Sequence, residues 1–205
     1  MYKRQVFGIV DARGVVLASS SIKTRKNPTI EGYLDELHTE LTKLLEANDA
    51  VGKIHGIGIG APNANYYTGT IESGVNLPWP TPIPLAKLVS EKFGIPVSIT
   101  NDANAAAIGE MTYGAARGLK DFIMITLGTG VGSGIVINGQ LVYGHDGFAG
   151  ELGHIIVKRN NGRLCGCGRR GCLETYCSAT GVAQSAREFL EARASAVSYT
   201  HLRAH

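Results

Sequence analysis

Four side chains in the last third of the chain have the types and the spacing of a metal site. His154 is followed by Cys165, Cys167 and Cys172, and the loop that carries the cysteines is polar and rich in glycine. Three thiolates and one imidazole are the donors of a closed, tetrahedral zinc site. Free thiols in a core are the alternative, but a polar loop is a poor core. We therefore predict a structural zinc ion here and assign Cys177, on the following helix, to the core.

Asp102 is a candidate general base. Together with Asn101 it stands where a buried strand is predicted to end and a helix to begin. The N-terminus of a helix holds a carboxylate rigidly and stabilises its charge, which suits a base that accepts a proton from a hydroxyl. Aspartate at such a point more commonly caps the helix, and the residue alone leaves both roles open.

Two glutamates bracket the predicted metal site. Glu151 precedes His154 by one helical turn, and Glu174 follows shortly after Cys172. A surface glutamate is usually only solvated. Here a bound metal would draw Glu151, His154 and Glu174 together, so we expect the three side chains to share one site.

A glycine-rich turn follows a strand predicted over 122–127. Gly128, Thr129, Gly130 and Gly132 occur within it. Backbone N–H groups exposed in such a turn bind phosphate oxygens, to which a threonine hydroxyl can add. A strained bend between two strands is the alternative. Because the next predicted element is another strand, the pattern differs from the Walker A and Rossmann motifs.

The elements that must position these residues alternate between strand and helix, which is typical of an α/β fold. Apolar spacing and turn residues predict strands over 6–10, 15–17, 54–60, 95–100, 122–127, 135–137 and 140–143, and helices over 30–45, 85–93, 102–116 and 174–194. A boundary near Gly118 would divide the chain into two units.

Composition narrows the possible functions. The chain has 205 residues, and its formal net charge of +3 comes from Lys3, Arg4 and Arg203 near the two ends, so the body is neutral and has no basic stripe for nucleic acid. No apolar run is long enough for a membrane span, and the start does not have the pattern of a secretory signal. Clustered cysteines of this kind indicate metal binding in a reducing cytoplasm.

Taken in order, these residues resemble the ROK family of sugar kinases and sugar-responsive repressors, and within it the bacterial glucokinases. The stretches that carry the resemblance are GIGIGAPN, NLPWP, ITNDANAAAIGE, ITLGTGVGSGIVINGQ, GFAGELGHIIV and CGCGRRGCLETYCSAT. The likeness runs from about Val6 to about Arg193, and the combination of its motifs is highly specific.

The resemblance implies an actin-like ATPase fold, in which two ribonuclease-H-like α/β units enclose a sugar cleft. Residues 6–118 would form the first unit, and 119–194 would begin the second. Family kinases open with a strand that leads into an Asp-x-Gly-Gly-Thr phosphate loop, which has no match here. We therefore expect both units to be incomplete, with 1–5 and 195–205 as non-native ends, and we expect only part of the nucleotide site, so the fragment itself could be inactive.

The resemblance also assigns roles. Asp102 would take the proton from the sugar 6-hydroxyl as that oxygen attacks the γ-phosphate of ATP, which would act with Mg²⁺. The turn formed by Gly128, Thr129, Gly130 and Gly132 would bind phosphate. His154, Cys165, Cys167 and Cys172 would hold structural zinc, and the residues that bind sugar hydroxyls would be Asn76, Asn101, Glu151, His154 and Glu174.

The family leaves other functions open. A sugar-responsive repressor would need a winged helix-turn-helix, whereas the presence of Asp102 favours a kinase. The resemblance to bacterial glucokinases makes glucose the first expected substrate. N-acetylmannosamine, N-acetylglucosamine, mannose and fructose are alternative substrates. The expected partners are therefore the small molecules sugar and ATP, with neither nucleic acid nor membrane, and the full-length protein is expected to be a cytoplasmic homodimer.

Overall fold

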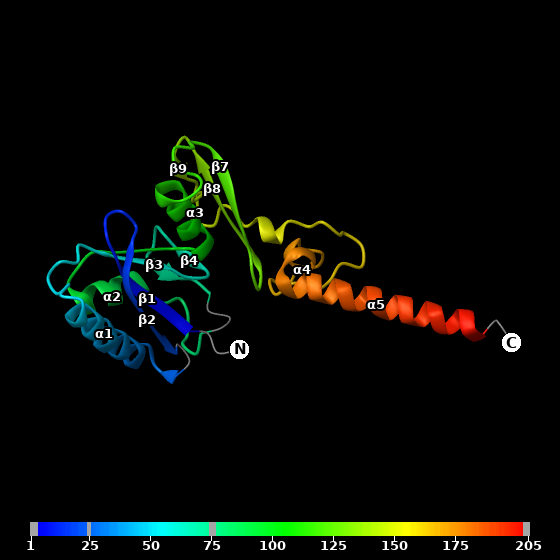
Figure 1. Ribbon diagram of the computed structural model, residues 1–205, viewed down its shortest axis with the longest axis horizontal. Coiled ribbons are helices and arrows are strands. Elements are labelled where there is room, and N and C mark those ends of the chain that lie inside the picture. The colour runs from blue at the N-terminus through cyan, green and yellow to red at the C-terminus, as the bar shows by residue number, and fades with distance from the viewer. Residues whose placement is uncertain (1–3, 24–25, 74–76, 203–205) are drawn as a thin grey trace.

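The computed structural model describes residues 4–23, 26–73 and 77–202, which alternate between strands and helices (Figure 1). The elements are, in chain order, β1 (Arg4–Val10), β2 (Val16–Lys23), α1 (Ile30–Ala47), β3 (Ile57–Gly60), β4 (Ala64–Asn65), β5 (Thr70–Ile71), α2 (Leu85–Phe93), β6 (Val97–Thr100), α3 (Asp102–Tyr113), β7 (Phe122–Leu127), β8 (Val131–Ile137), β9 (Gln140–Leu141), the short 3₁₀ helix η2 (Leu152–His154), α4 (Glu174–Cys177) and α5 (Ala179–Leu202). The α/β class is confirmed.

The first two strands form the predicted hairpin. β1 and β2 pair antiparallel, and the Asp11 carboxylate closes the turn by accepting the backbone N–H groups of Arg13 and Val15, each at 2.9 Å. β2 is longer than the predicted strand over 15–17 because its pairing with β1 continues to Lys23.

The core of the N-terminal half lies between α1, α2 and the short strands. α1 begins at its predicted cap, where Thr29 Oγ1 accepts the Gly32 N–H at 3.2 Å, and it buries Tyr33, Leu34 and Leu37. Apolar side chains from the elements that follow complete this core: Ile71, Ile83, Leu85, Val89 and Ile99.

A parallel pair of strands leads to the candidate base. β3 pairs with β6 so that Gly60 lies opposite Thr100, and the two strands end together. β3 begins at Ile57, whereas the sequence predicted a start at residue 54. Since α3 starts immediately after β6, Asp102 lies at this end of the pair.

A large cavity separates the hairpin from the parallel pair. It has a volume of about 1190 Å³ and is lined by residues of β1 and β3 and by apolar residues of α1 and α2, among them Leu37, Leu41 and Val89. Among the described strands, β1 therefore pairs with β2 alone and β3 with β6 alone.

Helix α3 packs closely on the sheet formed by β7, β8 and β9. The sheet is antiparallel, in the order β7-β8-β9, and glycines of β8 face α3. A Cβ atom on Gly132 would lie 2.8 Å from the Cβ of Ala103, and one on Gly134 would lie 2.6 Å from that of Ala107. Both distances are shorter than a real contact, so these glycines let the helix approach the strand backbone.

The C-terminal elements differ from the prediction. The single helix expected over 174–194 is divided into α4 and α5, because Ser178 is extended (φ −70°, ψ 166°) and its hydroxyl accepts the Gly181 N–H at 3.1 Å. α5 projects away from the rest of the molecule (Figure 1) and includes 195–202, part of the segment expected to be non-native. The helix predicted to end at Ala116 ends at Tyr113.

We expect Gly134→Ala to lower the free energy of unfolding by about 1–3 kcal/mol, because the added methyl group overpacks the contact between α3 and β8. Gly109→Ala is the matched control. A Cβ atom on Gly109, inside α3, would meet no atom of the described residues within 4 Å other than the helix's own backbone, so alanine there should stabilise α3 by up to about 1 kcal/mol. Urea denaturation measures both changes, and equal stability of the two variants would contradict the packing argument.

Candidate functional site

The predicted metal ligands come together. One nitrogen or sulfur atom from each of His154, Cys165, Cys167 and Cys172 lies within 4.8 Å of those of the other three. Cys165 Sγ is 3.6 Å from His154 Nδ1, and the sulfurs of Cys167 and Cys172 are 3.7 Å apart. These separations fit one tetrahedral ion, for which bonds of about 2.0–2.3 Å place neighbouring ligand atoms roughly 3.5–3.8 Å apart. The four side chains could therefore hold a zinc ion.

The loop around the cysteines is held by backbone contacts. Isolated antiparallel bridges join Ile156 to Cys172 and Leu164 to Arg170. A Cβ atom on Gly171 would collide with the carbonyl of Lys158, so the loop can close this tightly only because residue 171 is glycine.

Arg163 connects this loop to the last helices, and the sequence analysis did not identify it. Its guanidinium donates to the carbonyl of Thr175 at 2.7 Å and to that of Gly181 at 3.1 Å. It also lies over the ring of Tyr176, 4.7 Å from the centroid. An arginine in a polar loop is usually solvated, so its spacing in the sequence carries no signal for this role.

The thiols occupy different electrostatic environments. The backbone N–H of Arg169 is the main cause that lowers the pKa of Cys167, to about 6. Burial is the main cause that raises the pKa of Cys165, whose thiol donates to Glu174 Oε1 at 2.9 Å. A metal ion binds cysteines as thiolates, so metal binding at this cluster would release the protons that the thiols otherwise carry.

His154 connects the metal cluster to the glutamates. Its Nδ1 lies on the cysteine side and is 3.8 Å from Glu174 Oε1, whereas its Nε2 lies 3.9 Å from Glu151 Oε2. The three side chains therefore share one site, as the sequence predicted. A metal on Nδ1 would leave Nε2–H as a donor directed to the side of Glu151.

Asp102 belongs to the same group of charges. Partial burial is the main cause that raises the pKa of Glu151, and the charges of Asp102 and Glu174 raise it further. Asn101 caps α3, because its Oδ1 accepts the Ala103 N–H at 2.8 Å. The cap role that was open for Asp102 is thus filled by its neighbour, although Asp102 Oδ1 also accepts that N–H, at 2.9 Å.

The glycine-rich turn lies beside Glu174. Gly128 N–H donates to the carbonyl of Gly130 at 3.0 Å, and a Cβ atom on Gly130 would lie 2.8 Å from Glu174 Oε2. The turn is shorter than the sequence suggested, since Gly132 lies inside β8 and packs against α3. That packing explains the glycine at 132, and its predicted contact with phosphate stays a prediction, as do those of Gly128, Thr129 and Gly130.

Ser133 also supports the site and was missed by sequence analysis. This buried residue of β8 donates its hydroxyl to the carbonyl of Gly150, the residue before Glu151. A Cβ atom on Gly150 would lie 2.8 Å from the carbonyl of Ser133. The segment that carries Glu151 is thus packed directly on β8.

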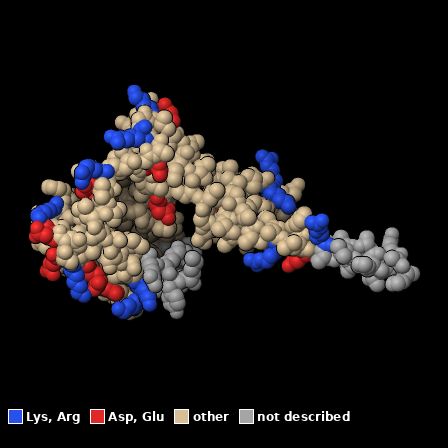
Figure 2. Space-filling model, viewed as in Figure 1, with Lys and Arg blue, Asp and Glu red and all other residues tan. Residues whose placement is uncertain are grey.

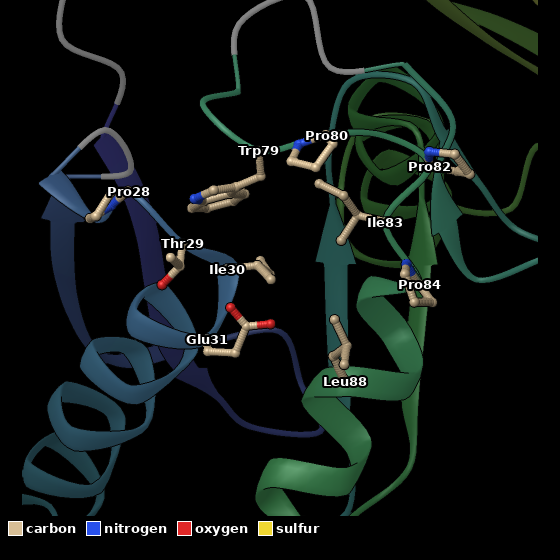
Figure 3. Close-up of a pocket in the computed structure, with 10 residues that line it drawn as sticks. All are labelled: Pro28, Thr29, Ile30, Glu31, Trp79, Pro80, Pro82, Ile83, Pro84 and Leu88. Carbon is tan, nitrogen blue, oxygen red and sulfur yellow. The ribbon is translucent and has the colours of Figure 1, made fainter.

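Asn76, a predicted sugar ligand, lies outside the described residues. The nearby Trp79 is a buried anchor: it packs on Tyr33 with ring centroids 4.9 Å apart and donates to the carbonyl of Asn27 at 3.1 Å. Around it is a pocket of about 380 Å³ lined by prolines and by the start of α1 (Figure 3). Trp79 therefore fixes the loop that follows Asn76.

The face shown in Figure 2 is hollowed between the N-terminal elements and the arm that ends in α5. Acidic side chains lie in this hollow, whereas most lysines and arginines lie at the outside. Carboxylates without basic partners are acceptors for hydroxyl groups.

None of the described helices combines the length and the apolar character that a membrane-spanning segment needs.

The chain is similar to proteins with two different functions. It is 51% identical to a glucokinase of Halalkalibacterium halodurans over 134 residues, which are 65% of the chain and 40% of that protein. It is 34% identical to a xylose repressor of Bacillus spizizenii over 194 residues, 93% of the chain and 48% of the repressor. The chain thus spans about half or less of the length of these relatives.

The structure resembles that of a ROK family glucokinase from Streptomyces griseus, which was solved in complex with glucose and AMPPNP. The TM-score is 0.75 at 38% identity, and the match covers 92% of this chain and 58% of that one. The likeness confirms the actin-like ATPase fold, built on ribonuclease-H-like units. The family model described as "ROK family" matches residues 3–204, so the chain belongs to the ROK family.

Proposed function

We propose that the protein transfers the γ-phosphoryl group of ATP to the 6-hydroxyl of a hexose, with glucose as the first candidate. The observation that carries this proposal is the meeting of three carboxylates around His154: Glu151 lies beside its Nε2 and Glu174 beside its Nδ1, and the charge of Asp102 is close enough to raise the pKa of Glu151, after the larger effect of burial. Glucokinases among the relatives support it, and so does the presence of an aspartate at residue 102.

Asp102 would act as the general base. It accepts the proton of the 6-hydroxyl while that oxygen forms a bond to the γ-phosphorus, and the bond from the γ-phosphorus to the bridging oxygen of ADP breaks. Phosphoryl transfer depends mostly on positioning and charge neutralisation. The N–H groups at Thr129 and Gly130 would bind phosphate oxygens, Gly128 would let the backbone approach them while its own N–H donates within the turn, and Mg²⁺ brought by ATP would neutralise their charge.

The other polar groups would bind the sugar. A buried sugar needs a partner for each hydroxyl, since an unpaired polar group in a cleft is costly. Asn101, Glu151 and Glu174 supply acceptors, and Nε2–H of His154 supplies a donor. Asn76 would contribute from the first unit.

Zinc held by His154, Cys165, Cys167 and Cys172 would be structural. With all four positions taken by protein ligands, a zinc ion has no open site for substrate. Its contribution would be to fix the tautomer and the orientation of His154. The thiolates that it needs persist in a reducing cytoplasm, where we place the protein.

One observation keeps an alternative in view. The repressor relative supports a sugar-responsive regulator, in which the same hydroxyl-binding groups would sense a sugar without transferring phosphate. N-acetylmannosamine, N-acetylglucosamine, mannose and fructose would use the same 6-hydroxyl chemistry. A homodimer is proposed for the full-length protein.

We expect Cys172→Ser to lose bound zinc, because it removes a buried thiolate from the closed site. Cys177→Ser is the matched control: Cys177 is outside the cluster, so zinc should stay at one equivalent. Metal analysis of the two purified variants measures this. A Cys172→Ser protein with full zinc content, or loss of zinc from Cys177→Ser, would overturn the ligand assignment.

We expect Asp102→Asn to keep glucose affinity within about threefold and to lower the transfer rate by about 10²–10⁴-fold, because the proton acceptor is lost. Titration calorimetry measures binding, and formation of glucose 6-phosphate measures transfer. Asp35→Asn, an exposed aspartate on α1, should change neither.

Undiminished transfer by Asp102→Asn would refute the assignment of Asp102 as the general base. Glucose binding without any transfer by an unsubstituted chain that also binds ATP would favour the sugar-sensing function, and failure to bind glucose or any of the alternative sugars would refute both.

A further inference from the structure

Three tyrosines form a cluster between two segments that are far apart in the sequence. Tyr66 and Tyr67 follow β4, and Tyr143 follows β9. The rings of Tyr66 and Tyr143 are stacked, with centroids 4.2 Å apart and an angle of 11° between the planes. Tyr67 meets Tyr143 edge-on at 5.9 Å. The turn after β4 is thus joined to the loop after β9 through Tyr143.

A hydrogen bond joins the same two segments. Asn65 is buried, and its Nδ2 donates to the carbonyl of Asp146 at 2.9 Å while its Oδ1 accepts the Tyr67 N–H at 2.9 Å. Gly147 has φ 82°, and a Cβ atom there would lie 2.7 Å from Asn65 Oδ1. The contact therefore combines ring stacking with close backbone packing.

The loop held by this contact leads directly to Glu151. Its shape depends on Tyr143, whose carbonyl accepts the Ala149 N–H at 2.9 Å. The phenol of Tyr143 also lies near Thr100, the residue before Asn101 and Asp102: burial raises the pKa of Tyr143, and the Thr100 hydroxyl partly opposes this, although that hydroxyl is buried and has no hydrogen-bond partner among the described residues. Tyr143 thus contacts the loop before Glu151 through its backbone carbonyl and lies near the segment before Asp102 through its side chain.

We propose that Tyr143 is a positioning residue for the sugar site: its stack on Tyr66 holds the loop 142–150 so that Glu151 faces Asp102. This inference rests on the proposed function and adds to it a part of the sugar site that lies outside the residues that bind sugar. Tyr66 is 44% exposed, so its ring contributes little to the core, and the stack on Tyr143 accounts for its place.

Sugar affinity tests the proposal. Tyr143→Ala and Tyr66→Ala should each raise the Kd for glucose by about three- to tenfold, the range expected for loss of an aromatic pair. Tyr143→Phe keeps the stack and should stay within about twofold. Tyr113→Ala removes a tyrosine that is 53% exposed at the end of α3, outside the cluster, and should leave the Kd unchanged. Equal affinity in Tyr143→Ala and the unsubstituted chain would overturn the proposal.

A double-mutant cycle separates positioning from general destabilisation. If Tyr143 acts through Glu151, then Tyr143→Ala should change the affinity less than twofold in a chain that already carries Glu151→Gln. Fully additive effects would overturn the coupling to Glu151.

Hydrogen exchange tests without any sugar whether the stack of Tyr143 on Tyr66 holds the loop 142–150, a contact called the clamp below. In Tyr143→Ala the amides of Ala149 and Leu152 should exchange at least tenfold faster, whereas the amides of α1 should not change. If the unsubstituted chain binds no hexose, the proposed function fails while faster exchange still supports the clamp. Unchanged exchange over 142–152 would overturn the clamp whether or not sugar binds.

Discussion

The close approach of α3 to the backbone of β8 is the constraint on which the rest of the site depends. Gly132 and Gly134 of the strand face Ala103 and Ala107 of the helix at distances that admit no further carbon atom. An interface packed this closely resists displacement, because adding even one methyl group would force the helix and the strand apart. Since Asp102 is the first residue of α3, its position relative to β8 is set by that contact.

The same strand positions the opposite wall of the site. Ser133 lies between the two glycines and donates to the carbonyl of Gly150, so β8 contacts α3 and the Glu151 segment at successive residues. Partial burial is the main cause that raises the pKa of Glu151, and repulsion by the charges of Asp102 and Glu174 adds to it. The fold holds the charges in place with apolar and backbone contacts that do not depend on charge, which leaves the carboxylates available for a ligand.

The local parts of this site could be predicted from the sequence, and the long-range parts could not. The cysteine spacing identified the metal cluster because the three thiols lie within a single loop, and Asp102 followed from the order of strand and helix. Gly132 was assigned to a phosphate turn because its spacing matches one, whereas the structure shows the packing that requires a glycine there. The roles of Ser133, Arg163 and Tyr143 depend on partners distant in the chain, for which their residue types carry no signal.

Two different sets of contacts therefore hold the side chains proposed to bind the sugar. His154 and Glu174 are held by the metal loop, whose contacts are local, whereas Asp102 is held by helix packing. Their junction is close: a Cβ atom at residue 130 would lie 2.8 Å from Glu174 Oε2, and the same oxygen accepts the Val131 N–H at the start of β8 at 3.4 Å. Because that N–H belongs to the strand on which α3 rests, a shift of the metal loop would move Glu174 against the same backbone that orients Asp102. A zinc ion bound by this loop would thus affect the proposed phosphoryl transfer without touching a substrate.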